Sequence, residues 1–224
     1  MIGLPRVHHR LTDSTNERAK ELALAGAPHG TLVTADEQTA GRGRQGRAWS
    51  AEPGEALLMS LVLRQPDELL PLRAAVAVTG SIPVPARIKW PNDVWVGGKK
   101  VSGILVEGRP QEGWAVLGIG LNVSTRSFPG ELAGIATSLA LAGVSLSREE
   151  ALRSLLASLE RWLAAPASQV LAAWRERDAL LGASVSWNGG RGRGAGITDS
   201  GAMRVETDAG IVELDAGEVH LSGG

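Results

Sequence analysis

The chain of 224 residues contains no cysteine, which excludes disulfides, thiolate metal sites and cysteine nucleophiles. It also lacks an apolar run of membrane-spanning length, and its start, MIGLPRVHHR, does not have the pattern of a signal peptide. Its formal net charge is only −1, whereas proteins that coat nucleic acid are usually basic. We therefore expect a cytoplasmic protein with no membrane association, which binds a specific anion rather than a polyanion.

Lysine is scarce, because only four of the 23 basic residues are lysine and the rest are arginine. Three of them, Lys89, Lys99 and Lys100, lie within twelve residues. A compact ammonium differs from a guanidinium in its geometry, so this cluster indicates a place where an ammonium is required. Histidine is scarce too. The pair His8–His9 has no third ligand nearby, which favours a solvated terminus over a metal site.

The N-terminal half alternates between helix and strand signals. Ser14 and Glu17 have the spacing of a capping box, which predicts a helix that begins near Ser14. Residues 31–38 and 56–64 are predicted strands, the second of them fully buried, and a short helix is predicted around residues 72–78.

Residues 86–123 predict an antiparallel meander, with Gly97–Gly98 as a two-residue hairpin turn. Two helices follow, one that starts with a capping box at Ser147 and one over residues 168–181 that ends at Gly182. After Gly182 the runs are short and alternating, as in a small all-β module of SH3-like size.

The stretch GRGRQGR, residues 41–47, fits several known loops at first sight. A dinucleotide fingerprint requires a helix to follow, but Pro53 and Gly54 prevent one, and no acidic residue lies about 20 positions on. A P-loop requires Lys-Ser/Thr at its end, where this chain has Arg47–Ala48. RNA-binding RG segments are longer and repetitive. The remaining interpretations are a plain surface loop or a loop whose backbone amides and arginines approach an anionic ligand.

Further motifs favour the second interpretation. In order along the chain stand S-T-N (14–16), Q-x-A-G-R-G-R-x-G-R-x-W (38–49), K-W-P-N-D (89–93), K-x-x-G-I-L-V-E (100–107) and G-I-G-x-N-V (118–123). With these motifs the chain resembles the biotin–protein ligases. The resemblance implies an α+β fold with a mixed, largely antiparallel sheet flanked by helices, as in class II aminoacyl-tRNA synthetases. It also implies a catalytic domain over residues 1–180 and an SH3-like barrel over 181–224.

The implied activity is the ATP-dependent conversion of biotin to biotinyl-5′-AMP, followed by transfer of biotin to a lysine of a biotin carboxyl carrier protein. A lipoate– or octanoate–protein ligase is the alternative, and the full Gly/Arg and K-W-P-N-D motifs argue against it. Mg²⁺ is expected to arrive with ATP and to keep several waters. The S-T-N motif starts at residue 14, so we expect no DNA-binding domain; a homodimer is compatible with the resemblance.

The resemblance also implies roles for individual residues. Lys100 would bridge the biotin carboxylate and the α-phosphate, with Arg44 and Lys89 also near the phosphates. Trp49 would either stack near ATP or anchor the loop in the core. The 189–194 stretch is expected to be a hairpin loop, with a contact to ATP or the carrier as the weaker alternative. The other implied biotin- and nucleotide-binding residues are Ser14, Thr15, Asn16, Gln38, Arg42, Gly43, Arg47, Asn92, Asp93, Gly103 and Asn122.

Overall fold

A seven-stranded mixed sheet forms the centre of the computed structural model, which describes residues 2–222. Its strand order is β1-β2-β3-β7-β6-β5-β4. β1 and β2 are parallel, and every other neighbouring pair is antiparallel. The strands are β1 Arg6–Thr12, β2 Leu32–Gln38, β3 Ala56–Arg64, β4 Arg87–Lys89, β5 Asp93–Val96, β6 Lys99–Arg109 and β7 Trp114–Asn122.

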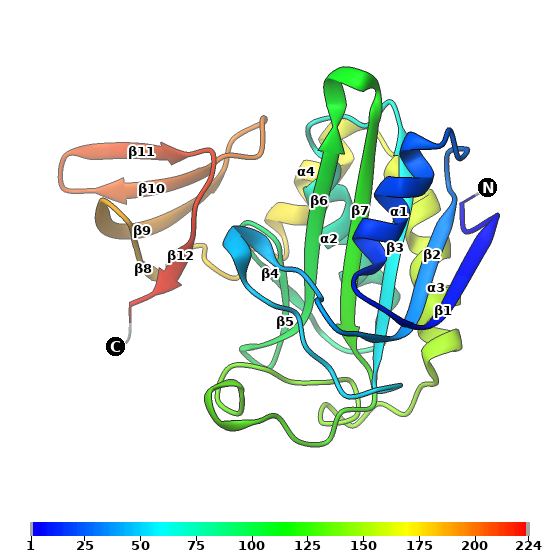
Figure 1. Cartoon of the computed structure of the whole chain (residues 1–224). Coiled ribbons are helices and arrows are strands. Elements are labelled where there is room, and N and C mark those ends of the chain that lie inside the picture. The colour runs from blue at the N-terminus through cyan, green and yellow to red at the C-terminus, as the bar shows by residue number, and fades with distance from the viewer. Residues whose placement is uncertain (1, 223–224) are drawn as a thin grey trace.

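Helices cover both faces of this sheet (Figure 1). Consecutive strand residues point to opposite faces, and the core divides accordingly. Val33, Val62 and Val116 pack with Ala19 and Ala23 of α1, whereas their neighbours Leu32, Leu61 and Leu117 belong to the larger cluster under α2, α3 and α4. The helices are α1 Thr15–Leu24, α2 Leu70–Ser81, α3 Arg148–Ala164 and α4 Ala167–Arg175, with short 3-10 turns η1 Arg44–Gly46, η2 Pro110–Glu112 and η3 Gly130–Leu132.

The C-terminal segment forms a second, five-stranded antiparallel sheet beside the first (Figure 1). Its order, β11-β10-β9-β8-β12, leaves β11 and β12 as open edges within the described residues, so the closed barrel that we expected is not observed. Val185, Val205 and Val219 of this sheet belong to the same apolar cluster as the main core. The strands are β8 Ser184–Trp187, β9 Gly190–Ile197, β10 Met203–Thr207, β11 Gly210–Leu214 and β12 Val219–Leu221.

Several predicted elements are confirmed. The meander over residues 86–123 is present as β4 to β7, and its turn at Gly97–Gly98 has φ values of 57° and 77°, in the left-handed region. The Ser147 capping box is formed in both directions, with the serine hydroxyl accepting from the amide of Glu150 and the Glu150 carboxylate accepting from the amide of Ser147.

Other expectations were wrong. Ser14 precedes α1, but its side chain makes no capping hydrogen bond. The last helix ends at Arg175 rather than 181, because the following residues Arg177 and Ala179 exchange backbone hydrogen bonds with Ile88 of β4. The expected 189–194 loop is mostly strand β9. His8 and His9 lie in strand β1, which the polar sequence RVHHRLT did not suggest.

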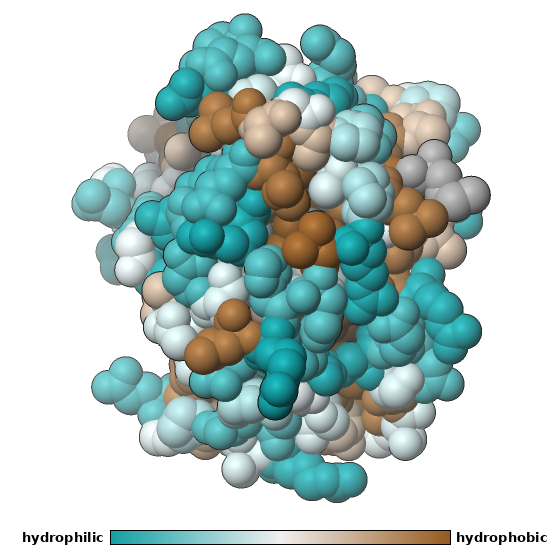
Figure 2. Space-filling model, turned by 45° about the vertical axis from the view of Figure 1, so that its right-hand side comes forward, coloured by the Kyte–Doolittle hydropathy of each residue, from teal (hydrophilic) through white to brown (hydrophobic). Residues whose placement is uncertain are grey.

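The outer surface is mostly hydrophilic in the view of Figure 2, with hydrophobic residues gathered mainly in a band near its middle. Across residues 2–222, no helix combines the length and the apolar character that crossing a membrane would require.

Candidate functional site

One deep pocket brings together residues from α1, β2, β6, β7, the β4–β5 turn and the start of β12. It contains about 900 Å³ of space not filled by protein atoms, part of it open to solvent. All but one of the predicted site residues line it: Ser14, Thr15, Asn16, Gln38, Arg42, Gly43, Arg44, Arg47, Trp49, Lys89, Asn92, Asp93, Lys100 and Gly103.

Polar side chains form one end of the pocket. Gln38 Oε1 accepts hydrogen bonds from Thr15 N (2.7 Å) and Thr15 Oγ1 (3.0 Å), so the glutamine satisfies an amide of the first helical turn. Ser60 Oγ lies 2.8 Å from Thr15 Oγ1 and 2.6 Å from Asn16 Oδ1. Buried Thr15, Asn16 and Ser60 therefore orient one another, and this end is suited to a ligand with several hydrogen-bonding groups.

Asn16 fits there only because the strand beneath it carries glycine. A Cβ atom at Gly118 of β7 would stand 2.1 Å from Asn16 Oδ1. The amide nitrogen of Asn16 donates to Glu107 Oε2 of β6 at 2.9 Å. The Asn16 carboxamide is thus fixed by Ser60 on one side and Glu107 on the other.

Cations gather at the other end of the pocket around a single carboxylate. Lys100 Nζ lies 2.7 Å from Asp93 Oδ1. In the β4–β5 and β5–β6 pairings, Asp93 is opposite Lys89 and Gly103, which places Lys89, Asp93 and Lys100 on neighbouring strands. Within the described part of the chain, the pocket lining holds two lysines and three arginines against two carboxylates, Asp93 and Glu218.

Two of these cations have lowered pKa values, mainly because they are partly buried. Burial lowers the pKa of Lys89, and the charges of Lys100 and Arg47 lower it further, against the opposing effect of Asp93. Burial also lowers the pKa of Arg44, with Arg47 contributing and Asp93 opposing. An anionic ligand would relieve the repulsion among these groups, so the geometry favours a phosphate- or carboxylate-containing ligand at this end.

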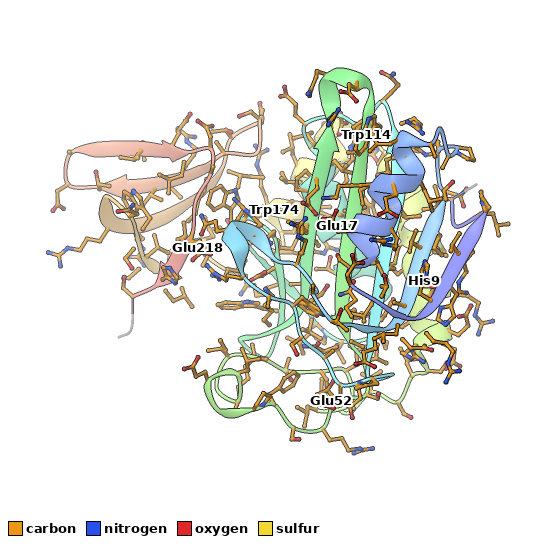
Figure 3. The ribbon with its side chains drawn as sticks, in the orientation of Figure 1. His9, Glu17, Glu52, Trp114, Trp174 and Glu218 are labelled. Carbon is orange, nitrogen blue, oxygen red and sulfur yellow. The ribbon has the colours of Figure 1, made fainter. Side chains whose placement is uncertain are left out.

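The glycine–arginine loop, residues 41–49, closes one side of the pocket and is attached at three points. Arg42 forms ion pairs with Glu17 of α1 and Glu107 of β6. Trp49 places its ring 5.6 Å from Lys100 Nζ. Arg47 pairs with Glu218, just before β12, and Figure 3 shows Glu17 and Glu218 on different sides of the loop.

Trp49 rests directly on the sheet. A Cβ atom would stand 2.4 Å from the indole at Gly120 and 3.0 Å from it at Gly103, and these two glycines face each other across β6 and β7. The indole therefore occupies space that only paired glycines leave free. Of the two interpretations of Trp49, the loop-anchoring one fits this contact.

Replacement of Gly120 by alanine is expected to lift Trp49 from the sheet and to release that end of the glycine–arginine loop. Because the indole contacts Lys100, we expect the rate of the reaction at this site to fall about tenfold, with a loss of stability of about 1–3 kcal/mol from overpacking. Steady-state kinetics and thermal unfolding would measure both effects. Unchanged kinetics at full occupancy of the ligands would contradict the anchoring role.

Asn122 is the predicted site residue that does not line the pocket. Its buried side-chain amide donates to Thr137 O at 2.9 Å, and its backbone oxygen accepts from Leu139 N. It holds the segment that follows β7 rather than facing the cavity. The predicted contact of Asn122 with a nucleotide has no support in this geometry.

Some residues that line the pocket or support its lining were not anticipated. Ser60 was visible only as one serine in the apolar strand ALLMSLVLR. Glu107 stood at the end of a recognised motif without a role. Glu218 and Gly217 come from the C-terminal segment, in which the sequence drew attention only to the 189–194 stretch, and no local sequence signal distinguishes them.

No cluster of three or more histidine, aspartate or glutamate side chains that could hold a metal ion occurs in the part of the chain that the structure describes. Of the carboxylates in the pocket, Asp93 pairs with Lys100 and Glu218 with Arg47. A metal ion at this site would therefore depend largely on oxygen atoms of the ligand and on water.

Both the sequence and the structure of this chain resemble those of known proteins. The sequence model of the biotin/lipoate A/B protein ligase family matches residues 8–124. The chain is 36% identical over 244 residues to the bifunctional ligase/repressor BirA of Bacillus subtilis, with 99% of this chain and 75% of that protein covered. It is 35% identical over 238 residues to the biotin–[acetyl-CoA-carboxylase] ligase of Paracoccus denitrificans, with 95% and 98% covered. The structure resembles that of the Aquifex aeolicus biotin protein ligase in complex with biotin and ATP, with a TM-score of 0.87, 30% identity, and 97% and 99% of the two chains covered.

Proposed function

This chain belongs to the biotin/lipoate A/B protein ligase family, and we propose that it is an ATP-dependent biotin–protein ligase. In the first step a carboxylate oxygen of biotin attacks the α-phosphorus of ATP, and the bond to the bridging oxygen breaks, giving biotinyl-5′-AMP and pyrophosphate. In the second step a lysine amine of a biotin carboxyl carrier protein attacks the carbonyl carbon, AMP leaves, and the amine loses a proton.

The observation that carries this proposal is the two-ended pocket. Thr15, Asn16 and Gln38 supply hydrogen-bonding groups at one end, where the buried Ser60 supports Thr15 and Asn16, and Lys100, Lys89 and Arg44 supply positive charge at the other. The fused ring of biotin carries a urea group that makes several hydrogen bonds, and its side chain ends in a carboxylate. A lipoyl or octanoyl group would leave the polar end without hydrogen-bonding partners, which a buried polar site disfavours strongly.

Lys100 is proposed as the residue that bridges the biotin carboxylate and the α-phosphate. Two anions must approach each other for the first step, and an ammonium between them lowers their repulsion and stabilises the charge that develops on the phosphate. Lys89 and Arg44 lie at the same end and are proposed to bind the remaining phosphate oxygens. No proton-abstracting side chain is required for this step.

Mg²⁺ is proposed to enter with ATP, bound mainly by phosphate oxygens and water. Asp93 and the side-chain oxygen of Asn92 lie on the pocket wall nearby, and Asn92 Nδ2 already donates to Ile104 O. We also propose residues 1–180 as the catalytic unit and the C-terminal sheet, within 181–224, as a smaller accessory unit. The ion pair of Glu218 with Arg47 supports a role of that sheet in positioning the glycine–arginine loop.

Biotin-dependent exchange of label between pyrophosphate and ATP tests the proposal directly. We expect exchange with biotin, and none of comparable rate with lipoate or octanoate run in parallel. Exchange with lipoate and not with biotin would contradict the proposal and favour the alternative ligase.

The lowered pKa of Lys89 predicts a pH dependence of ATP binding. As pH rises through this pKa, the free protein loses the ammonium charge, whereas bound phosphates favour the charged form. Binding then requires uptake of a proton, so the KM for ATP should rise about tenfold for each pH unit above the pKa of free Lys89, until that of the complex is reached. This window begins below the ordinary lysine pKa of 10.5.

Lys89→Arg should flatten this profile, since arginine keeps its charge over the whole range. Lys99→Arg, which changes the exposed lysine beside Lys100, serves as the control and should keep the original profile. The same slope of KM against pH in Lys89→Arg and the unaltered protein would show that another group titrates.

A further inference from the structure

Glu107 is a carboxylate that touches two parts of the pocket with different tasks. One oxygen accepts from Asn16 Nδ2 at 2.9 Å, at the polar end of the cavity. The other lies 3.3 Å from Arg42 Nη1 of the glycine–arginine loop and 3.3 Å from Lys20 Nζ. The fixed wall and the covering loop therefore meet at one side chain.

Glu107 belongs to a small cluster of charged side chains. Glu17, Lys20 and Arg42 complete a group of two carboxylates and two cations, in which Lys20 Nζ lies 2.7 Å from Glu17 and Arg42 pairs with both acids. The side chain of Glu107 is only 27% exposed, so these contacts are less screened than ordinary surface pairs. The charges balance, and Arg42, although half exposed, forms ion pairs with both carboxylates on the wall of the pocket.

Asn16 depends on Glu107 for its orientation. Ser60 holds its oxygen side and Glu107 its nitrogen side, and the missing Cβ of Gly118 leaves the space that its oxygen occupies. An amide whose nitrogen lost this acceptor could turn, and its hydrogen-bonding pattern toward a ligand would reverse.

We propose that Glu107 is a positioning residue that couples closure of the glycine–arginine loop to recognition of the biotin ring. The proposal rests on the proposed function for the identity of the ligand. Glu107 fixes the carboxamide of Asn16 that faces the ring, and the same carboxylate holds Arg42 so that the loop covers the ring. Glu17 shares only the second task, because it contacts Arg42 and Lys20 and not Asn16.

Hydrogen exchange of the ligand-free protein tests the loop contact without any assay of activity. Glu107→Ala and Glu17→Ala should each speed amide exchange over residues 41–49, by about fivefold or more, because each removes an attachment of Arg42. Glu112→Ala is the matched control, since Glu112 pairs with Arg109 at the far end of the same hairpin. Equal loop exchange in Glu107→Ala and the control would overturn the proposal.

Steady-state kinetics separate the two tasks. In Glu107→Ala the KM for biotin should rise about tenfold, as for loss of a charged hydrogen bond, with the KM for ATP changed less than about twofold. In Glu17→Ala the KM for biotin should rise by only about threefold, despite a similar increase in loop exchange. An unchanged KM for biotin in Glu107→Ala, or an equal rise for ATP, would refute the coupling.

If the proposed biotin–protein ligase function is wrong, the experiments give a different result. The unaltered protein would then show no biotin-dependent exchange at all, and Glu107 could not be coupled to a biotin ring. With biotin-dependent activity present, the Glu107→Ala and Glu17→Ala comparison alone decides whether Glu107 positions Asn16. The Glu17 variant also guards against a folding defect, since it tests the loop contact without disturbing β6.

Discussion

Lys100→Ala is expected to reduce biotin-dependent ATP–pyrophosphate exchange by a factor of at least about 100–1,000. Removal of one preorganised donor at a developing charge costs that much in other active sites, and Lys100 is proposed to face two anions at once. The loss should appear in kcat as well as in KM, because the bridging contact is strongest when the carboxylate and phosphate meet.

The fold should survive this substitution. The backbone of Lys100 keeps its hydrogen bonds with Ile135 and Thr137, and the side-chain contacts that are lost are the partly buried pair with Asp93 and the contact with the Trp49 ring. Fully exposed pairs contribute about 0–1 kcal/mol, and this partly buried pair is expected to contribute slightly more. Thermal unfolding within a few degrees of the unaltered protein would therefore accompany the loss of exchange.

Lys99→Ala is the control for this experiment. Lys99 precedes Lys100 on β6, points to the opposite face and is exposed, with one hydrogen bond from its ammonium to Ala133 O at 3.3 Å. It should retain near-normal exchange. Near-normal exchange in Lys100→Ala would show that another cation bridges the two anions and would remove the centre of the proposed mechanism.

Much of the fold was predictable because its signals are local. The hairpin at Gly97–Gly98 requires a left-handed backbone that glycine provides, and the Ser147 box satisfies amides within its own first turn. Ser14 carries the same local pattern, yet it does not cap its helix. A side chain from a neighbouring strand, Gln38, accepts from the first amide of this helix, that of Thr15, and this contact depends on the pairing of distant segments.

The candidate site also contains residues that local motifs predict and residues that depend on the packing of distant segments. Residues inside dense motifs, such as Lys100 and Arg44, could be predicted to share a pocket because each motif supplies several of its members at once. Glu218 could not, because its place depends on how the C-terminal sheet packs against the glycine–arginine loop. The expected barrel failed for a related reason, since strand alternation predicts sheets but does not decide whether the edge strands β11 and β12 meet.

The glycines of the central sheet leave space for particular side chains, and the sequence alone does not reveal which ones. G-I-G-x-N-V was recognisable as a motif, but the sequence does not state what each glycine makes room for. Gly118 leaves space for Asn16, and Gly120 leaves space for Trp49. Alternate residues of one strand therefore shape the polar end and the loop anchor of the same pocket.

Gly118→Ala is accordingly expected to abolish tight biotin binding. Its methyl group would stand 2.1 Å from Asn16 Oδ1, and neither partner can withdraw easily. β7 lies between β3 and β6 in the middle of the sheet, and Asn16 is held by Ser60 and Glu107. The asparagine must turn away and give up both bonds. Overpacking costs about 1–3 kcal/mol and the unpaired polar groups about 1–3 kcal/mol more.

These costs predict a rise of about 30-fold or more in the dissociation constant for biotin, measured by calorimetry, together with a clear fall in the unfolding temperature. Gly134→Ala is the control, because nothing lies within 4 Å of a Cβ atom there. The double variant Gly118→Ala with Asn16→Ala separates the loss of stability from the loss of biotin affinity. Without the clash its stability should recover above that of Gly118→Ala alone, while biotin binding stays weak because the Asn16 carboxamide is gone. Recovery of tight binding in the double variant would show that Asn16 only obstructs the pocket and does not recognise the ligand.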